Sequence, residues 1–453
     1  MRPIPEPPPA TLNTERVQAH ELKVEVCLIT RLYGGGARAG AIDERSWIRP
    51  PAFKSALRFW WRAGHAHLFE NLADLHREES RLFGSPGRFR GDEIDGGPGL
   101  VQVRVEGAVS ANVDLKAYQP EQGDPLNVAY FPAALTRDGE EQKLGMPEQG
   151  AKRVRAHLVM AFDPSATAAD VGQIQTALRL FLVLGGIGAR SRRGAGALGL
   201  VREETAKELG VPTSRAELSA FFNRFLRPDH PGEARVGLWS LAHCKAVWLG
   251  RKETSSGEEA QQQLLATLRE ARQDRPHPGN WQGKAGWGQS RWPEGDAIRW
   301  KTQKSSPPAA SWRHKPHPKN QGCFPRAALG LPIIVHFKDQ RHGEDPPDHS
   351  VSAAIPAAQP GGKPTRINRF ASPLILRPVR IWVAGAPRHI PVAVLGPMTL
   401  RPDAVPAVEL TKNNVVPETP APQDLIPTYS IAAHADLAFS KVIEKFSSFH
   451  RLV

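Results

Sequence analysis

The chain has 453 residues, 40% of them hydrophobic, with 59 lysines and arginines against 46 acidic residues and a formal net charge of +13. This length exceeds one ordinary domain, and the apolar content excludes a wholly disordered chain. The basic excess indicates a polyanionic partner, nucleic acid first, and the alternative is a basic surface kept for solubility.

The cysteines and the N-terminus indicate where the protein works. Cys27, Cys244 and Cys323 are far apart and form no Cys-x-x-Cys pair, which excludes a disulfide framework and favours a reducing compartment. The proline-rich residues 1–20 lack the apolar core of a signal peptide, and no apolar run reaches the ~18 residues that span a bilayer. We expect a flexible tail at 1–20, no metal or cofactor, and a cytoplasmic protein.

The residues after the tail follow the order strand, helix, strand, strand, helix, strand. Alternating apolar residues predict the strands, and apolar residues at three- and four-residue steps predict the helices. This order is that of the split βαβ, or ferredoxin-like, unit, whose helices cover one face of an antiparallel sheet and leave the other free. The predicted elements are strands at 22–29, 100–106, 154–162 and 197–201, a helix that begins at Arg49-Pro50-Pro51, and a helix at 170–184.

The second half predicts a similar unit with a large insertion. We therefore expect an α+β protein with two ferredoxin-like domains in tandem, at 21–235 and 236–453. Residues 273–325, rich in Pro, Gly, Trp, Lys and Arg, show little periodicity and predict a long irregular loop. The other predicted elements are strands at 244–249, 331–337, 379–383 and 390–395 and helices at 258–271 and 433–446.

A glycine- and arginine-rich segment, residues 185–196, lies between the second helix and the closing strand of the first unit. Glycines let a backbone approach a ligand closely, and arginines suit phosphate oxygens. No Gly-Lys-Ser/Thr follows, and the order helix then strand is the reverse of a dinucleotide fingerprint. The alternative is a mobile, solvated loop with a helix C-cap at Gly185. The predicted RNA contacts are Gly186, Gly188, Arg190, Ser191, Arg192 and Arg193.

The first helix carries a second candidate surface. Lys54, Arg58 and Arg62 stand at i, i+4 and i+8 and form one basic stripe beside the apolar face. Trp61 is a candidate for stacking on a base, whereas Trp60 falls in the apolar register. The alternative is a solvated helix face with both tryptophans in the core. Arg45 and Arg49, just before the helix, complete this predicted RNA surface.

Two further segments in the second half combine features of nucleic-acid binding. Arg366 and Arg369, with Arg377 and Arg380 beyond them, predict a matching phosphate contact, and the alternative is an ordinary basic loop. In the insertion, tryptophans alternate with basic residues, which suits single-stranded nucleic acid. The alternative is that these tryptophans anchor the loop to its own domain or to a neighbouring subunit. They are Trp281, Trp287, Trp292, Trp300 and Trp312.

The sequence contains no convincing catalytic constellation, so we expect no enzyme. RNA hydrolysis needs a general base near neutral pKa and a cation. His65 and His67 lie near Arg62, but a helix histidine more often faces solvent or packs with its ring hydrogen-bonded. Paired carboxylates with metal-site spacing, Gly-x-Ser-x-Gly and His-Glu-x-x-His are absent from the 453 residues.

The ordered combination of motifs resembles the RAMP superfamily of CRISPR proteins. It comprises the glycine turn at 34–36, Arg-Pro-Pro-x-x-Lys-x-x-Leu-Arg-x-Trp-Trp-Arg from Arg49, Leu82-Phe83-Gly84, and Gly-Gly-x-Gly-x-Arg-x-Arg-Arg-Gly-x-Gly from Gly185. Within the superfamily the match is closest to the first subunit of the type III-B (Cmr) effector complex. The resemblance covers residues 22–202 and continues more weakly at 329–332 and 369–374.

The resemblance implies tandem ferredoxin-like domains and a place in a multi-subunit ribonucleoprotein built on a guide RNA. It implies a non-catalytic RNA-binding subunit near the guide 3′ end, which contacts other Cmr subunits and helps capture target RNA. Cleavage is implied for a different, repeated subunit, and residues 273–325 do not align. Two alternatives stay open, a RAMP-type endoribonuclease that processes guide RNA and a protein–protein adaptor without RNA contact.

Overall fold

The computed structural model describes most of the chain. The described residues are 20–34, 42–43, 45–90, 93–109, 114–117, 143–146, 154–226, 238–274, 280–281, 284–285, 290–302, 317–337, 345–355, 365–367, 371–397, 407–412, 425–430 and 435–452. Residues 1–19 of the predicted tail at 1–20 lie outside them, as do the glycines at 35, 36 and 40.

The N-terminal unit is built on a four-stranded antiparallel sheet in the order β4-β7-β1-β8. The third of these strands in sequence lies between the first and the second, which is the strand order of a split βαβ unit. All four strands were predicted from the sequence, the first two from the alternation of apolar and polar residues. They are β1 (Glu21–Leu28), β4 (Val101–Glu106), β7 (Arg155–Phe162) and β8 (Leu198–Leu200).

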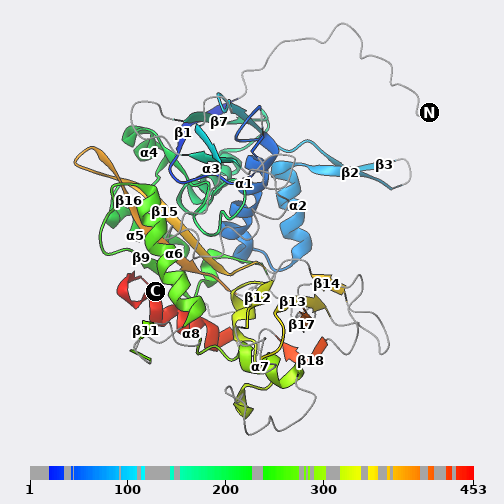
Figure 1. Cartoon of the computed structure of the whole chain (residues 1–453). Helices are drawn as coiled ribbons and strands as arrows, with labels where there is room; N and C mark the ends of the chain where they lie inside the picture. The colour runs from blue at the N-terminus through cyan, green and yellow to red at the C-terminus, as the bar shows by residue number, and fades with distance from the viewer. Residues whose placement is uncertain are drawn as a thin grey trace.

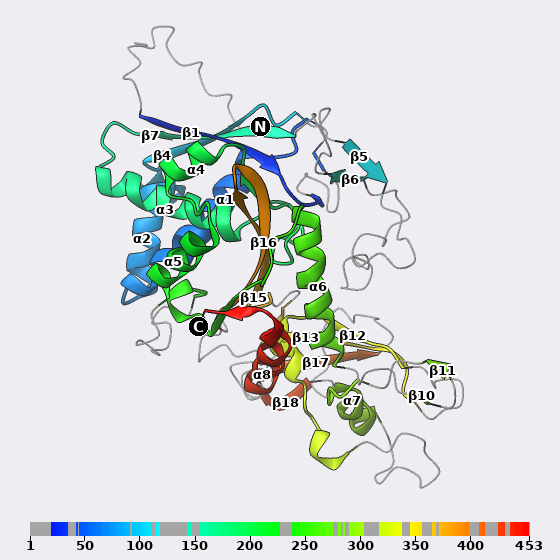
Figure 2. The same cartoon turned by 90° about the vertical axis from the view of Figure 1, so that its left-hand side faces the viewer.

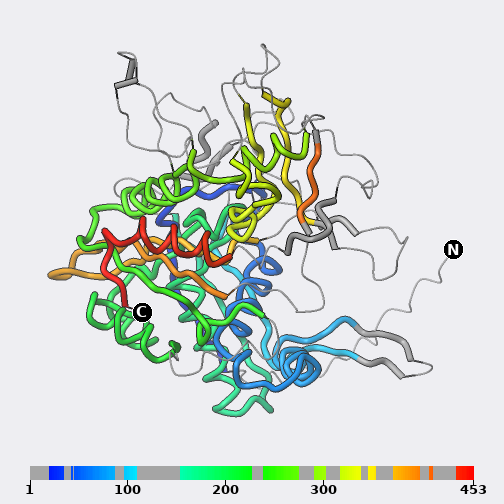
Figure 3. The backbone as a smooth tube through the Cα atoms, turned by 90° about the horizontal axis from the view of Figure 1, so that it is seen from below, coloured from blue at the N-terminus to red at the C-terminus, as the bar shows by residue number. Residues whose placement is uncertain are grey.

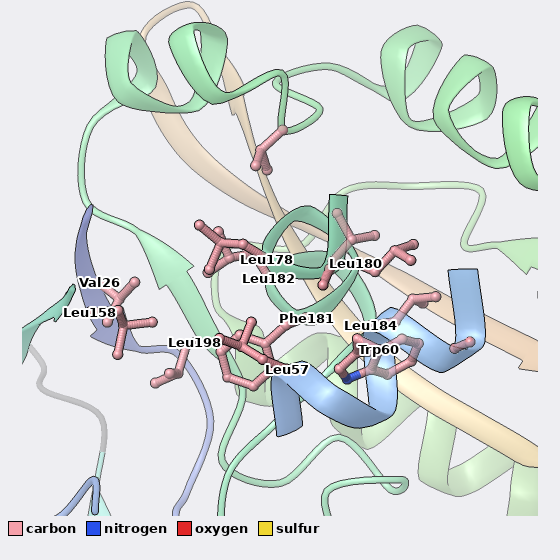
Figure 4. Packing of buried hydrophobic residues seen from close by; sticks show 14 of the residues in the cluster. Val26, Leu57, Trp60, Leu158, Leu178, Leu180, Phe181, Leu182, Leu184 and Leu198 are labelled. Carbon is pink, nitrogen blue, oxygen red and sulfur yellow. The ribbon is translucent and has the colours of Figure 1, made fainter. Parts of the chain in front are cut away.

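Two helices, α1 (Pro50–His65) and α3 (Ala168–Leu184), cover one face of this sheet, as Figure 2 shows. Prolines are tolerated in the first turn of α1 because those N–H groups have no helical partner. In α3, Thr167 and Asp170 form a capping box. Leu57 and Trp60 of α1 meet α3 in the core (Figure 4).

The opposite face of this sheet carries charged side chains of both signs. Cross-strand pairing brings basic side chains against acidic ones, so this face has little net attraction for a polyanion. The ion pairs are Lys23–Glu106 at 2.7 Å, Arg104–Glu21 at 2.9 Å and Arg155–Glu25 at 3.0 Å.

This unit also contains several helices and strands that the sequence did not predict. The hairpin of β2 and β3 projects away from the body (Figure 1). The additional elements are α2 (Leu72–Phe83), β2 (Ser85–Arg90), β3 (Glu93–Gly97), β5 (Asp114–Ala117), β6 (Lys143–Met146), α4 (Glu203–Leu209) and α5 (Arg215–Phe225).

The C-terminal unit repeats this connectivity. Its antiparallel sheet has the order β15-β16-β9-β19, so the third strand in sequence again lies between the first and the second. The helices α6 and α8 lie side by side (Figure 3). The elements are β9 (Ala246–Leu249), α6 (Gly257–Gln273), β15 (Leu374–Val383), β16 (Ala386–Leu395), α8 (Ala435–Lys445) and β19 (His450–Arg451).

Additional structure is inserted between α6 and β15 and between β16 and α8. It includes a further sheet with the path β12-β13-β17-β18 and with β14 paired to β13. The strands are β12 (Ile333–Val335), β13 (His349–Ile355), β14 (Thr365–Ile367), β17 (Ala407–Lys412) and β18 (Leu425–Ser430), with a short hairpin of β10 (Asn280–Trp281) and β11 (Lys284–Ala285) before them.

The prediction of an irregular loop at 273–325 is wrong for α7 (Glu294–Thr302). Acidic residues in the first turn of α7 stabilise it by interacting with the helix dipole, and Ala297 and Ile298 are buried. A nine-residue helix whose buried apolar residues are only Ala297 and Ile298 has too little hydrophobic periodicity to stand out among tryptophans and basic residues.

The two units share one hydrophobic core. Alternate residues of the β15–β16 hairpin, such as Val379 and Val392, join the same buried cluster as Leu57 and Phe181 of the N-terminal unit. Leu376 and Ala393, which point the other way, pack in a second cluster with α6 and α8. We call the contact between this hairpin and the N-terminal unit the seam. The second sheet is therefore covered on both faces.

Candidate nucleic-acid interface

The glycine- and arginine-rich loop, residues 185–196, is compact and fixed at both ends. Gly185 closes α3 by donating its N–H to the Phe181 carbonyl at 2.7 Å, so the predicted helix end at Gly185 is confirmed. Across the loop, the Ile187 N–H donates to the Gly196 carbonyl at 3.0 Å. The Gly196 N–H donates to the Arg31 carbonyl at 2.8 Å. The loop is therefore an ordered part of the fold.

The glycines serve close packing within the protein. A Cβ on Gly186 would lie 2.7 Å from the Ala195 carbonyl oxygen, and one on Gly188, at φ +75°, would collide with the Tyr33 carbonyl oxygen. The loop thus presses against its own second half and against the segment that follows β1. This contact accounts for both glycines without a ligand, and it places the loop beside Gly34, the start of the predicted glycine turn.

Arg192 faces the C-terminal unit. Its guanidinium donates to the Ser372 carbonyl and lies 5.4 Å from the centre of the Phe59 ring. Burial lowers the pKa of Arg192 below its ordinary value. These contacts make Arg192 a link across the seam. We therefore do not include Arg192 among the candidate phosphate contacts.

The turn around Arg190 is the part of the loop nearest the surface. Arg190 adopts a left-handed backbone conformation with φ +62°, and its carbonyl accepts the Arg193 N–H at 2.8 Å. Ala189 is exposed, and the side chains of Arg190, Ser191 and Arg193 are half-buried. Of the RNA contacts predicted for this loop, these three side chains remain candidates.

The basic stripe of α1 faces another helix. Arg58 and Arg62 each lie 2.5 Å from the same carboxylate oxygen of Glu79 on α2, and Glu79 is 3% exposed. A buried carboxylate needs such partners, so both guanidiniums are engaged inside the protein. Lys54 remains beside them, and burial followed by the charge of Arg58 lowers its pKa.

The prediction that Trp61 offers a face for base stacking is wrong. Trp61 is 0% exposed, and its indole N–H donates to Gln173 of α3 at 2.8 Å. Trp60 lies in the core, as its register predicted. Both tryptophans are buried because Trp61 packs against Phe83 of α2, while Trp60 packs against Trp239.

The two arginines before α1 surround a turn. Arg45 is exposed and Arg49 is half-buried. Asp43 accepts the N–H groups of Arg45 and Ser46, and these backbone hydrogen bonds, with smaller effects from the Arg49 and Arg45 charges, lower the pKa of its carboxyl. Among the described residues, no hydrogen bond or ion pair joins the side chain of either arginine to the 185–196 loop.

The second-half arginines separate into two groups. Arg366 lies on β14, where its backbone pairs with Ala354, and its side chain is outside the described residues, as is Arg369 altogether. Arg377 is 1% exposed and donates to carbonyls of the N-terminal unit, so its expected phosphate contact is wrong. No sequence signal marks this role, because the partners lie 179 and 195 residues away.

Two insertion tryptophans anchor their own segment. Trp292 is 4% exposed and donates its indole N–H to the Ala271 carbonyl at 3.0 Å. The Trp300 indole N–H donates to the His317 carbonyl at 3.2 Å. For these two, the anchoring interpretation holds. Trp287 and Trp312 lie outside the described residues.

Of the two candidate histidines, His65 is the last residue of α1, and His67 lies in the 3-10 helix that follows, Ala66–Leu68. The His65 Nδ1 lies 2.9 Å from the Trp61 carbonyl and its ring stacks on Trp61. Burial lowers the pKa of His65, although that hydrogen bond and Glu78 act in the opposite sense. Within the described residues, no group of three His, Cys, Asp or Glu side chains is placed to hold a metal ion. No described helix is long and apolar enough to cross a membrane.

No curated protein matches this chain. The crystal structure of Cmr1 from Pyrococcus furiosus in its apo form is 17% identical, with a TM-score of 0.46, covering 95% of this chain and 98% of that chain. A chain of the type III-B Cmr-β complex bound to cognate target RNA is 10% identical, with a TM-score of 0.44, covering 94% and 99%.

A family model matches part of the N-terminal unit. The model described as the RAMP superfamily aligns with residues 26–199, from the middle of β1 to β8. The matched residues include the whole glycine- and arginine-rich loop, so this part of the chain is similar to the RAMP superfamily, as its ordered motifs predict.

Proposed function

We propose that this chain is a non-catalytic RNA-binding subunit of a cytoplasmic type III-B CRISPR (Cmr) effector ribonucleoprotein. In this proposal it lies near the 3′ end of the guide RNA, contacts neighbouring Cmr subunits and helps capture target RNA in antiviral defence. The order of the sequence motifs from the glycine turn to the arginine-rich loop supports the Cmr assignment.

The observation that carries the proposal is the loop itself. The RAMP match extends through residues 185–196, and the turn at Arg190 presents half-buried arginines beside Gly34 on a chain with a formal net charge of +13. Forked guanidinium donors suit phosphate oxygens, and phosphate contacts supply most of the affinity of sequence-independent RNA binding.

The shared connectivity of the two units supports a tandem arrangement. Both sheets place the third strand between the first and second, with one helix after the first strand and another after the third. We propose two ferredoxin-like domains, residues 21–235 and 236–453, with the insertions carried by the second. Sequence reading in such complexes is delegated to base pairing, so this subunit needs backbone contacts only.

The test measures RNA binding by the full chain after Arg190→Ala and Arg193→Ala together. The double variant is expected to bind guide-length RNA about tenfold more weakly and to reduce the salt slope by roughly two, one for each phosphate contact. The matched control is Arg77→Ala with Arg202→Ala, which removes the same charge at exposed positions on α2 and before α4.

Equal affinities for the two double variants would show that the loop does not touch RNA. If partners also co-purified after ribonuclease treatment and no RNA crosslink formed to residues 185–196, the adaptor interpretation would replace this proposal. Arg192 is left unchanged in the test because its contact with Ser372 ties the units together.

A further inference from the structure

The strand β15 of the C-terminal unit holds the 185–196 loop at three points. One guanidinium nitrogen of Arg377 donates to the Leu182 carbonyl at 3.1 Å and to the Leu198 carbonyl at 2.6 Å. The neighbouring Leu376 N–H donates to the Arg192 carbonyl at 2.9 Å. Leu182 precedes the loop, Leu198 follows it, and Arg192 lies within it.

The chemistry of the α3 terminus explains why a cation is stable there. The last carbonyls of a helix lack intrahelical partners and carry a partial negative charge. The last turn of α3 has no basic residue of its own, so Arg377 supplies the positive charge from the other unit. Burial lowers the pKa of Arg377 to about 9, which leaves it protonated at neutral pH.

Arg377 is a costly residue for a purely structural position. It is 1% exposed, and its Nε and Nη1 groups have no hydrogen-bond partner among the described residues. The groups that accept its hydrogen bonds are carbonyls rather than a carboxylate. An apolar side chain of similar volume would avoid this desolvation cost. An apolar side chain cannot, however, donate hydrogen bonds to Leu182 and Leu198 at once. We call these two flanking positions the stems of the loop.

We propose that Arg377 is a positioning residue, which fixes the two stems of the 185–196 loop and thereby the place of the Arg190 turn. This inference rests on the proposed function of the loop in RNA binding. The C-terminal unit then tunes the RNA affinity of the N-terminal unit without touching the RNA, because an ordered loop loses less conformational entropy on binding.

The main variant is Arg377→Met in the full chain, which keeps the volume and removes both hydrogen bonds. Hydrogen exchange of residues 185–196 is expected to accelerate, and RNA affinity to fall about tenfold through lost pre-organisation. The matched control is Arg380→Met on the same strand. Arg380 donates to the Leu200 carbonyl and to the Cys27 sulfur on β1, both outside the loop, so loop exchange should remain that of the original protein.

A double-mutant cycle tests whether Arg377 acts through the loop. In the Arg190→Ala, Arg193→Ala background, Arg377→Met should have no further effect on RNA affinity, because the contacts that it positions are gone. Additive losses would overturn the proposal and place the effect of Arg377 elsewhere. Unchanged loop exchange in Arg377→Met would overturn it as well.

The two proposals fail in different ways. If Arg190→Ala with Arg193→Ala leaves RNA binding intact, the function assigned to the loop fails, while exchange still reports whether Arg377 fixes the loop. If Arg377→Met does not fold, Arg377→Lys retains the charge but not the fork and should give an intermediate exchange rate. Global loss of protection in both variants would assign Arg377 to folding alone and overturn the positioning role.

Discussion

His389 is a titratable side chain of the seam that is held neutral. It lies on β16 with 5% exposure, and its Nε2 accepts a 3.5 Å hydrogen bond from Arg380. Burial and then the charges of Arg380, Arg377 and Arg388 lower its pKa to about 3. Protonation would place a fourth positive charge among these arginines.

This neutral histidine predicts acid sensitivity. The folded-state pKa lies below the ordinary value of 6.5, so the unfolded chain binds the proton first and stability falls as pH drops below 6.5. His389 should lower the free energy of unfolding by about 2 kcal/mol between pH 7 and pH 5. Denaturant titrations of His389→Gln, which cannot take up the proton, should show a correspondingly smaller loss over that range.

The control for this prediction is His76→Gln, because His76 is exposed on α2. Its stability profile should follow that of the original protein. Identical acid profiles for His389→Gln and the original protein would mean that His389 is not held neutral by the seam.

At the scale of elements, the loop between α3 and β8 illustrates how one sequence pattern serves two purposes. A run of glycines and arginines predicts contacts with RNA phosphates, and the RAMP match covers this run. In the structure, Gly188 gives room for Tyr33 and Arg192 reaches Ser372. These two residues therefore serve packing within the protein, although the sequence pattern alone suggested contacts with RNA.

Gly196 supplies the sharpest test of this packing. It has φ +59°, and a Cβ there would collide with the Ile187 carbonyl oxygen. Gly196→Ala should cost at least about 2 kcal/mol of unfolding free energy, because backbone strain and a backbone clash add. It should also accelerate hydrogen exchange within 185–196.

Gly107→Ala separates the two causes. Gly107 has φ +72°, but a Cβ at this position would meet no atom within 4 Å. Only the cost of the left-handed conformation, about 1 kcal/mol, therefore applies. Equal losses of unfolding free energy in the two variants would show that the 185–196 loop is not tightly packed at Gly196.

At the scale of the whole molecule, the seam joins the two units into one core. Ion pairs reinforce it, since Arg31 of the N-terminal unit lies 2.8 Å from Glu258 on α6. Backbone hydrogen bonds cross it too, as from Trp382 of β15 to the Thr213 carbonyl at 2.8 Å. We expect the two units to unfold together rather than as independent domains.

The full chain is expected to leave CRISPR repeat RNA intact during long incubation without added metal. The ring of His65 stacks on Trp61, and burial lowers its pKa, which makes it a weaker base than a free imidazole. Gel analysis beside a ribonuclease control would check this outcome. Cleavage that disappears in His65→Ala or His67→Ala would instead support the guide-processing enzyme.

Local sequence pattern was enough for much of the N-terminal unit. The strands β1 and β7 lie within a residue of their predicted bounds. For β1, one apolar and one polar face produce a period of two in the sequence. Helix α2 was not predicted, although Asn71 at its N-cap and buried Leu75 and Leu82 were available signals. In the C-terminal unit, the insertions separate β9 from β15 and blur the order of elements.

The sequence by itself determined the α+β class, the order of the main elements and the position of the arginine-rich loop, because these depend on the period of neighbouring residues. Only the tertiary structure decided that Trp61 is buried, that Arg58 and Arg62 belong to Glu79, and that Arg377 holds the loop. Those outcomes depend on which distant surfaces meet, and the pattern of nearby residues carries no record of a partner far along the chain.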